Sequence, residues 1–132
     1  MIYLDTSVAL AALLSEDVLP PPTLWAAPLF SSRLLEYELW TRLHSKGLSN
    51  AHSESARDIL SRVNIIEMSP DVLERVLEPF PIRVRTLDAI HLSTFNFLHR
   101  HRVKLKLATY DQRMKEAALS LGWSILDLPL SA

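Results

Sequence analysis

The sequence contains no cysteine, and glycine occurs only twice in its 132 residues, as Gly47 and Gly122. Without cysteine the chain has no disulfide, no zinc–thiolate site and no thiol nucleophile. With two isolated glycines it has no glycine-rich loop of the kind that holds nucleotide phosphates. The lack of cysteine is compatible with a reducing compartment, and we expect a cytoplasmic protein.

Long hydrophobic runs and an excess of one charge are also missing. The longest apolar run, Val8–Leu14, is far shorter than the ~20 residues that span a bilayer, so no membrane association is expected. Asp5 interrupts the N-terminus and no basic segment precedes an apolar run, so no secretory signal is expected. Lys and Arg number 14 and Asp and Glu 15, so bulk charge does not indicate nucleic acid binding, although a local basic face would suffice for it.

What is present is a hydrophobic content of 48% with 22% charged residues, which predicts one folded domain over residues 1–132. Short apolar or β-branched segments alternate with helical patterns. Strands are expected at 2–4, 29–31, 65–66, 104–109 and 123–126. Helices are expected at 8–14, 33–43, 70–77, 87–98 and 112–121, with another opened by Asn50 or Ser53 and carrying Ala56, Ile59, Leu60 and Val63. This alternation predicts an α/β fold with a parallel sheet covered on both faces.

Two aspartates follow predicted strands directly and precede predicted helices. Asp5 follows the first strand, and Asp111 follows the strand at 104–109. Because parallel strands end at the same edge of a sheet, the two carboxylates are expected at one edge, where ligands bind in open α/β sheets. The alternative is that each aspartate only starts its helix. Thr6 or Ser7 is expected to cap the first helix.

Two further acids lie inside predicted helices. Glu38 borders an apolar stripe, and its alternative role is a local ion pair with Arg42. Asp88 lies in the first turn of its helix, where it would complement the helix dipole or pair with Arg85. Glu36 is interpreted as a plain surface acid.

Clustered carboxylates repel one another, and at least one takes up a proton unless a cation joins them. Ligands that are all oxygen suit a hard cation such as Mg²⁺ or Mn²⁺. Such a site turns a bound water into a nucleophile and steadies a phosphate oxygen. Hydrolysis of a phosphodiester is the reaction that this arrangement serves best.

Four segments resemble, in chain order, the acidic motifs of PIN-domain proteins. They are Tyr3–Ser7, Ser32–Leu39, Arg85–Leu92 and Thr109–Met114, the last followed by Ala117, Ala118 and Gly122. The third segment is close to the corresponding motif of the VapC-type toxins. The resemblance implies a PIN-like three-layer α/β/α domain with four to five parallel strands. It implies a Mg²⁺-dependent endoribonuclease that cuts tRNA, rRNA or mRNA and stops translation. It also implies a cognate VapB-type antitoxin that occludes the acidic site, and a homodimer.

Carried over by position, the resemblance makes Asp5, Glu38, Asp88 and Asp111 the catalytic acids. Asp5, Asp88 and Asp111 are the metal ligands, with Asp111 binding through water or holding a second metal, and Mn²⁺ is an alternative to Mg²⁺. Thr6 would be a nearby hydroxyl that orients water. The segment Pro20–Trp25 departs from the family pattern.

Other residues have two interpretations. His91 is a possible ligand or acid, but packing between helix and sheet is preferred. The basic stretch 99–106 is interpreted as a solvated helix end, and the alternative is that some of its residues, with Arg83, Arg85 or Arg113, hold RNA phosphates. The three tryptophans are expected in the core or at an interface.

Three other functions compete with the toxin hypothesis. One is a PIN scaffold that serves only as a binding module, which the presence of all four acids disfavours. Another is a housekeeping PIN nuclease, which often carries further domains. A phosphate-accepting receiver domain would need an acidic pair after the first strand, where Asp5 is followed by Thr6 and Ser7.

Overall fold

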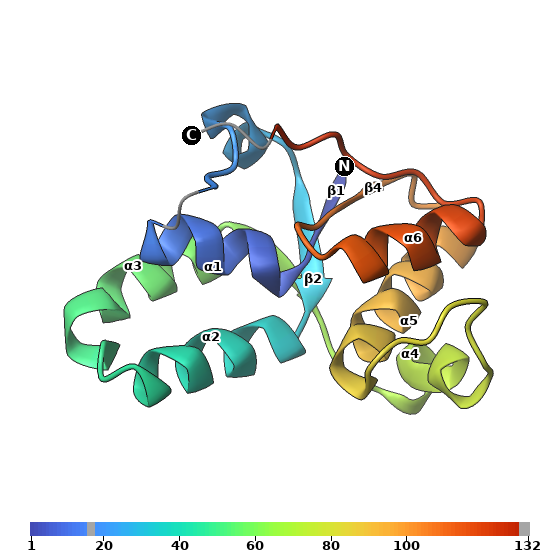
Figure 1. The fold of residues 1–132 in the computed structure, drawn as a ribbon, viewed down its shortest axis with the longest axis horizontal. Helices are drawn as coiled ribbons and strands as arrows, with labels where there is room; N and C mark the ends of the chain where they lie inside the picture. The colour runs from blue at the N-terminus through green and yellow to red at the C-terminus, as the bar shows by residue number, and fades with distance from the viewer. Residues whose placement is uncertain (16–17, 130–132) are drawn as a thin grey trace.

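The computed structural model describes residues 1–15 and 18–129 and contains a four-stranded parallel sheet between two layers of helices (Figure 1). The strands are β1 (Ile2–Leu4), β2 (Leu29–Ser32), β3 (Val63–Ile66) and β4 (Lys106–Ala108), in the order β3-β2-β1-β4. The predicted three-layer α/β/α fold is confirmed. The predicted strand at 123–126 is wrong, because only Ile125 forms a bridge, to Leu107.

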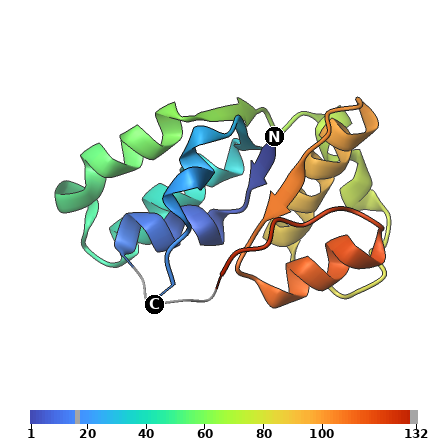
Figure 2. The ribbon, with the colours of Figure 1, turned by 90° about the horizontal axis from the view of Figure 1, so that it is seen from above.

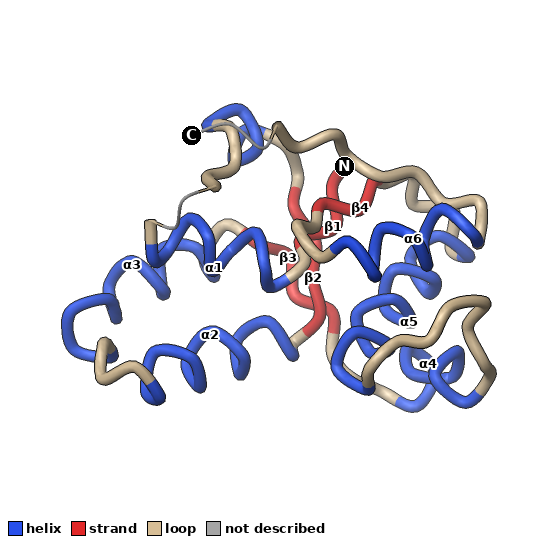
Figure 3. Tube along the Cα trace, viewed as in Figure 1, coloured by secondary structure: helices blue, strands red, loops and turns tan. Residues whose placement is uncertain are grey.

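The helices divide between the two faces of the sheet (Figures 1 and 3). One face is covered by α1, α2 and α3, and the other by α4, α5 and α6. Their bounds are α1 Thr6–Leu14, α2 Leu34–Ser45, α3 Ser49–Ser61, α4 Pro70–Leu73, α5 Thr86–Arg100 and α6 Gln112–Ser120, with 3₁₀ turns η1 Pro22–Ala26 and η2 Glu74–Leu77. None of the helices within residues 1–15 and 18–129 has the length and apolar character needed to cross a membrane.

The core consists of two clusters, one on each side of the sheet. Successive side chains of a strand point to opposite faces, so Leu4 joins the cluster under α1, α2 and α3, while Tyr3 joins the one under α5 and α6. In β4, Ala108 and Leu107 divide in the same way. Trp123 is buried in the second cluster and Trp40 packs at the border of the first, as the core or interface interpretation predicts.

Several helix starts differ from the sequence prediction. Asp5, and not Thr6 or Ser7, is the N-cap of α1, since its side chain accepts a hydrogen bond from the backbone N–H of Ser7 at 3.4 Å. The Thr6 hydroxyl is unavailable for capping because it donates elsewhere, to Glu38. The helix predicted at 87–98 begins one residue earlier, at Thr86, and ends at Arg100.

Two other boundaries move because a residue joins a strand. Ser32 belongs to β2, although its hydroxyl still accepts from the backbone N–H of Leu34 at 3.1 Å. Val63 was expected on the helical stripe with Ala56 and Ile59. It instead opens β3, where it pairs with Leu29.

The carboxyl ends of β1 and β4 form the topological switch point of the sheet. The chain leaves β1 for α1 on one face, and it leaves β4 for α6 on the other, as the two roughly perpendicular views show (Figures 1 and 2). Where adjacent strands send their chains to opposite faces, an α/β sheet binds its ligands. Because α5 leads back into β4, its N-terminal turn lies at this same edge.

Candidate active site

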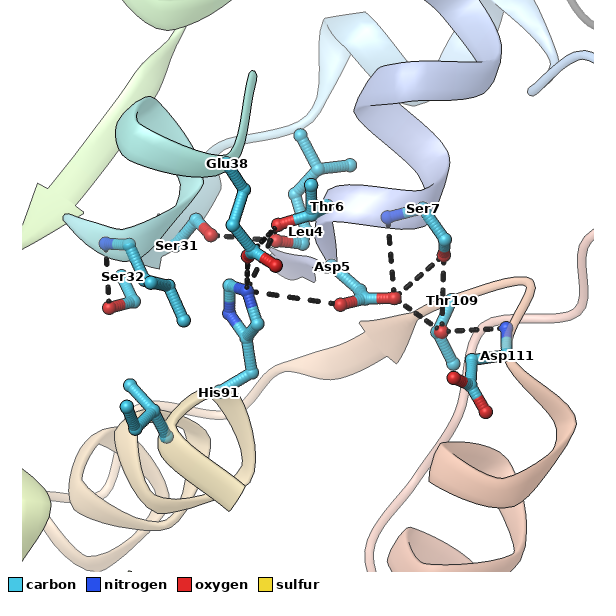
Figure 4. Close-up of polar contacts among 12 residues, drawn as sticks. Leu4, Asp5, Thr6, Ser7, Ser31, Ser32, Glu38, His91, Thr109 and Asp111 are labelled. Atoms are coloured by element: carbon cyan, nitrogen blue, oxygen red, sulfur yellow. Dashed lines mark hydrogen bonds and ion pairs between the residues drawn. The ribbon is translucent and has the colours of Figure 1, made fainter. Parts of the chain in front are cut away.

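Asp5 is buried at the carboxyl end of β1, with 4% of its surface exposed. Its Oδ2 accepts hydrogen bonds from the hydroxyls of Ser7 at 2.6 Å and Thr109 at 2.7 Å (Figure 4). Its Oδ1 accepts none from the described part of the chain, and lies 4.0 Å from Nε2 of His91. One oxygen of Asp5 is therefore fixed, and the other is free to bind a cation.

Asp111 follows β4 and is tied to the same network. Its Oδ1 accepts from the backbone N–H of Met114 at 3.1 Å, so it is the N-cap of α6. Its own backbone N–H donates to Oγ1 of Thr109 at 3.0 Å. Thr109 thus joins Asp5 to Asp111, and both aspartates are helix caps as well as neighbours at one edge of the sheet.

Asp88 lies in the first turn of α5 and is half-buried. Burial is the main reason that the pKa of its carboxyl is raised to about 6, and the negative charges of Asp111, Asp5 and Glu38 raise it further. The expected ion pair with Arg85 does not occur among the described residues. The structure therefore places Asp88 within electrostatic range of the three acids that the sequence grouped with it.

Glu38 comes from the second turn of α2, and its contacts differ from those expected. Oε1 accepts from Thr6 Oγ1 at 2.5 Å and from His91 Nε2 at 2.8 Å. No ion pair to Arg42 is present in the structure over residues 1–15 and 18–129. Thr6 therefore lies beside the acids, as the family resemblance implied, but its hydroxyl contacts Glu38.

His91 was interpreted mainly as a packing residue, and that interpretation is incomplete. The ring is buried, but both of its nitrogens are hydrogen-bonded within the site, with Nδ1 2.8 Å from the Tyr3 hydroxyl. Burial lowers the pKa of His91, but the hydrogen bond to Glu38 and the charges of Asp5, Glu38 and Asp88 outweigh it, so the pKa is raised above its usual value. The sequence signal was its position one helical turn after Asp88.

The donor set fits a hard divalent cation in its chemistry. Asp5, Asp88 and Asp111 offer only oxygen, and their mutual repulsion is what a cation would relieve. In the described ranges, no three side chains of His, Asp or Glu converge closely enough to form a ready-made metal site. The side chains would thus have to close around an ion, or leave positions to water, as Mg²⁺ commonly requires.

A groove of about 380 Å³ opens beside Thr6 and Glu38. Tyr37 and Leu87, both exposed, line it together with Arg42. A larger hollow of about 830 Å³ lies between α1 and α3, and none of the four acids lines it. Of the four acids, Glu38 is the one that lines the groove, so the groove reaches the Glu38 side of the acidic edge.

The basic residues separate into two groups. Arg85 precedes α5 directly and Arg113 lies in the first turn of α6, and both are exposed near the acidic edge. The basic stretch 99–106 begins at the other end of α5. At 1.5 Å per residue, Arg100 is about 18 Å along the helix from Asp88, so this stretch lies away from the acidic cluster.

Comparison with known proteins gives a consistent picture. The PIN domain family matches residues 2–119. The chain is 34% identical to Ribonuclease VapC46 of Mycobacterium tuberculosis over 129 residues, which is 95% of each protein. Its fold resembles a chain of a toxin–antitoxin complex from Klebsiella pneumoniae, with a TM-score of 0.59 and 26% identity over 86% of this chain and 88% of that one. It also resembles VapC20 of M. tuberculosis, described as a sarcin–ricin loop cleaving toxin, with a TM-score of 0.65 and 17% identity over 98% of this chain and 100% of the other.

Proposed function

Since the chain belongs to the PIN-domain family and is of the VapC type, we propose that it is a Mg²⁺-dependent endoribonuclease, the toxin of a type II toxin–antitoxin pair. The observation that carries the proposal is the acidic edge itself. Asp5 has one carboxylate oxygen, Oδ1, that accepts no hydrogen bond from the described residues, and the pKa of Asp88 is raised by burial and by the charges of the other carboxylates. A site of this kind takes up either protons or a cation.

In this proposal Asp5, Asp88 and Asp111 hold Mg²⁺, with Mn²⁺ as a substitute. When bound, such an ion would lower the pKa of a bound water and offset negative charge on the scissile phosphate. Asp5 is oriented by Ser7 and Thr109, so its Oδ1 keeps one direction. Glu38 keeps Oε1 on Thr6 and His91, which leaves Oε2 to take a proton from the attacking water as the water oxygen bonds to phosphorus. The P–O bond to the leaving oxygen breaks, and that oxygen takes a proton from solvent.

Arg85 and Arg113 flank the acids and would hold phosphates of the RNA on either side of the scissile bond. Cleavage of tRNA, rRNA or mRNA in the cytoplasm would stop translation. We further propose that residues 1–132 act as one domain, that a VapB-type antitoxin covers the acidic edge, and that the toxin is a homodimer. Coexpression with the product of the neighbouring open frame, followed by light scattering of the purified protein, tests both associations.

The decisive variant is Asp5→Asn. The amide oxygen can still accept the hydrogen bonds that start α1, so the fold is retained while the charge that holds the cation is lost. We expect Mg²⁺-dependent cleavage of total RNA to fall by more than about 100-fold, and growth arrest on induction to disappear. The matched control is Asp58→Asn on the exposed surface of α3, which should cleave like wild type.

Three outcomes would contradict parts of the proposal. Cleavage by Asp5→Asn at the wild-type rate would refute the site assignment. RNA binding without cleavage by the wild-type protein would favour a binding module. Cleavage without growth arrest would favour a housekeeping nuclease.

A further inference from the structure

His91 lies between two layers of the molecule with 1% of its surface exposed. It comes from α5 and contacts residues of both β1 and α2. Its Nδ1 is 2.8 Å from the Tyr3 hydroxyl. Its Nε2 is 2.8 Å from Oε1 of Glu38 and 3.0 Å from Oγ1 of Thr6 (Figure 4). If His91 served packing alone, its two ring nitrogens would be buried without hydrogen-bond partners, which costs free energy.

The partners assign the proton on one side of the ring. Nε2 faces a carboxylate oxygen, which only accepts, so Nε2 carries a hydrogen and donates it to Glu38. On the other side, Tyr3 is fully buried and its hydroxyl faces Nδ1, which prevents the ring from turning about its axis. The direction of the Nε2–H bond is therefore set by residues of two other elements.

Glu38 needs such a partner. Its side chain has three rotatable bonds and is 23% exposed at the rim of the groove, so little packing holds its carboxylate in one direction. The donors from His91 and Thr6 both meet Oε1. The other oxygen, Oε2, accepts no hydrogen bond from the described residues and remains available for chemistry.

We propose that His91 is a positioning residue, whose Nε2–H aims the carboxylate of Glu38 at the acidic edge, while Tyr3 fixes the ring. This inference rests on the proposed nuclease function for its catalytic readout. The inference explains why Tyr3, His91 and Glu38 form a chain of hydrogen bonds that runs from the core to the proposed site.

A matched pair of variants separates positioning from packing. His91→Gln places an amide nitrogen near the position of Nε2 and keeps a donor for Glu38. His91→Asn places its amide near Nδ1 and keeps only a partner for Tyr3. Both variants lose the ring and leave comparable space, so both should lower the melting temperature by similar amounts.

With an RNA oligonucleotide as substrate in Mg²⁺, we expect His91→Asn to lose about 10–100-fold in kcat with KM changed less than about twofold. We expect His91→Gln to retain kcat within about fivefold of wild type. Tyr3→Phe, which frees the ring but keeps its volume, should fall between the two. Equal losses in Asn and Gln variants, or no loss in the Asn variant, would overturn the proposal.

A second readout does not depend on cleavage. In ¹⁵N NMR of the wild-type protein, the His91 Nε2–H should exchange slowly with water, and Glu38→Ala should speed that exchange at least about tenfold. Unchanged exchange would show that Glu38 does not hold this hydrogen, and would refute the inference. If the wild type cleaves no RNA but the exchange behaves as expected, the proposed function fails while the geometric role of His91 stands.

Discussion

Replacing Asp88 by asparagine should stabilise the metal-free protein while removing its activity. The pKa of Asp88 is raised from 3.8 to about 6, mainly by burial and then by the charges of Asp111 and Asp5. The folded state therefore binds its proton more tightly than the unfolded chain does. As pH rises from about 4 to beyond 6, ionisation costs the folded state free energy, so the destabilisation is complete at neutral pH and absent below about 4.

The magnitude follows from the same values. At 1.36 kcal/mol per pH unit, the rise from 3.8 to about 6 corresponds to roughly 3 kcal/mol of unfavourable free energy for the ionised group. Asp88 is only half-buried, and solvent screening reduces this to about 1.5 kcal/mol. For a domain of this size, Asp88→Asn should raise the melting temperature by about 4–8 °C at pH 8 in EDTA.

Thermal unfolding followed by fluorescence or circular dichroism measures the effect. At pH 4 the wild type is protonated at Asp88, so the two proteins should melt within about 1 °C of one another. Adding Mg²⁺ at pH 8 should stabilise the wild type by mass action and should change the Asn variant much less. The control Asp58→Asn removes an exposed carboxylate that pairs with Arg62, and its melting temperature should stay near that of the wild type at both pH values.

Two results would refute this reasoning about Asp88. A lower melting temperature for Asp88→Asn at pH 8 would show that the carboxylate is stabilised and not repelled by its surroundings. A gain of the same size at pH 4 and pH 8 would show that ionisation is not its cause.

Two further predictions concern the rest of the edge. Asp111→Ser should keep the hydrogen bond that caps the backbone N–H of Met114, and with it the stability of the protein, whereas Asp111→Ala should lower the free energy of unfolding in urea by about 1 kcal/mol. Both variants should lose cleavage. A fully active serine variant would mean that the charge of Asp111 is not used. The double variant Arg85→Gln/Arg113→Gln should raise KM for RNA and flatten the dependence of kcat/KM on salt concentration. The control Arg62→Gln should change neither. An unchanged salt dependence in the double variant would show that neither arginine binds RNA phosphates.

The sequence alone determined the class of fold and the order of the acids. Short apolar segments separated by helical patterns were enough to predict a parallel sheet covered on both faces. Asp5 and Asp111 could be placed together because each follows a strand, and the ends of parallel strands meet at one edge. The assignment of the four acids as catalytic residues remains a prediction that the proposed variants test.

The tertiary structure decided which side chains contact those acids. Arg42 was the alternative partner of Glu38 because it lies one helical turn away. The hydrogen-bond partners of Glu38 are instead Thr6 and His91, which are 32 and 53 residues distant. For Asp88 the sequence offered the helix dipole as the alternative to a site role, and it could not show that burial and carboxylates from other elements raise its pKa. Local spacing fixes only which residues share a helix face, whereas hydrogen bonds between elements depend on how the layers pack. For this reason the acids could be read from the sequence, but the chain Tyr3–His91–Glu38 that supports them could not.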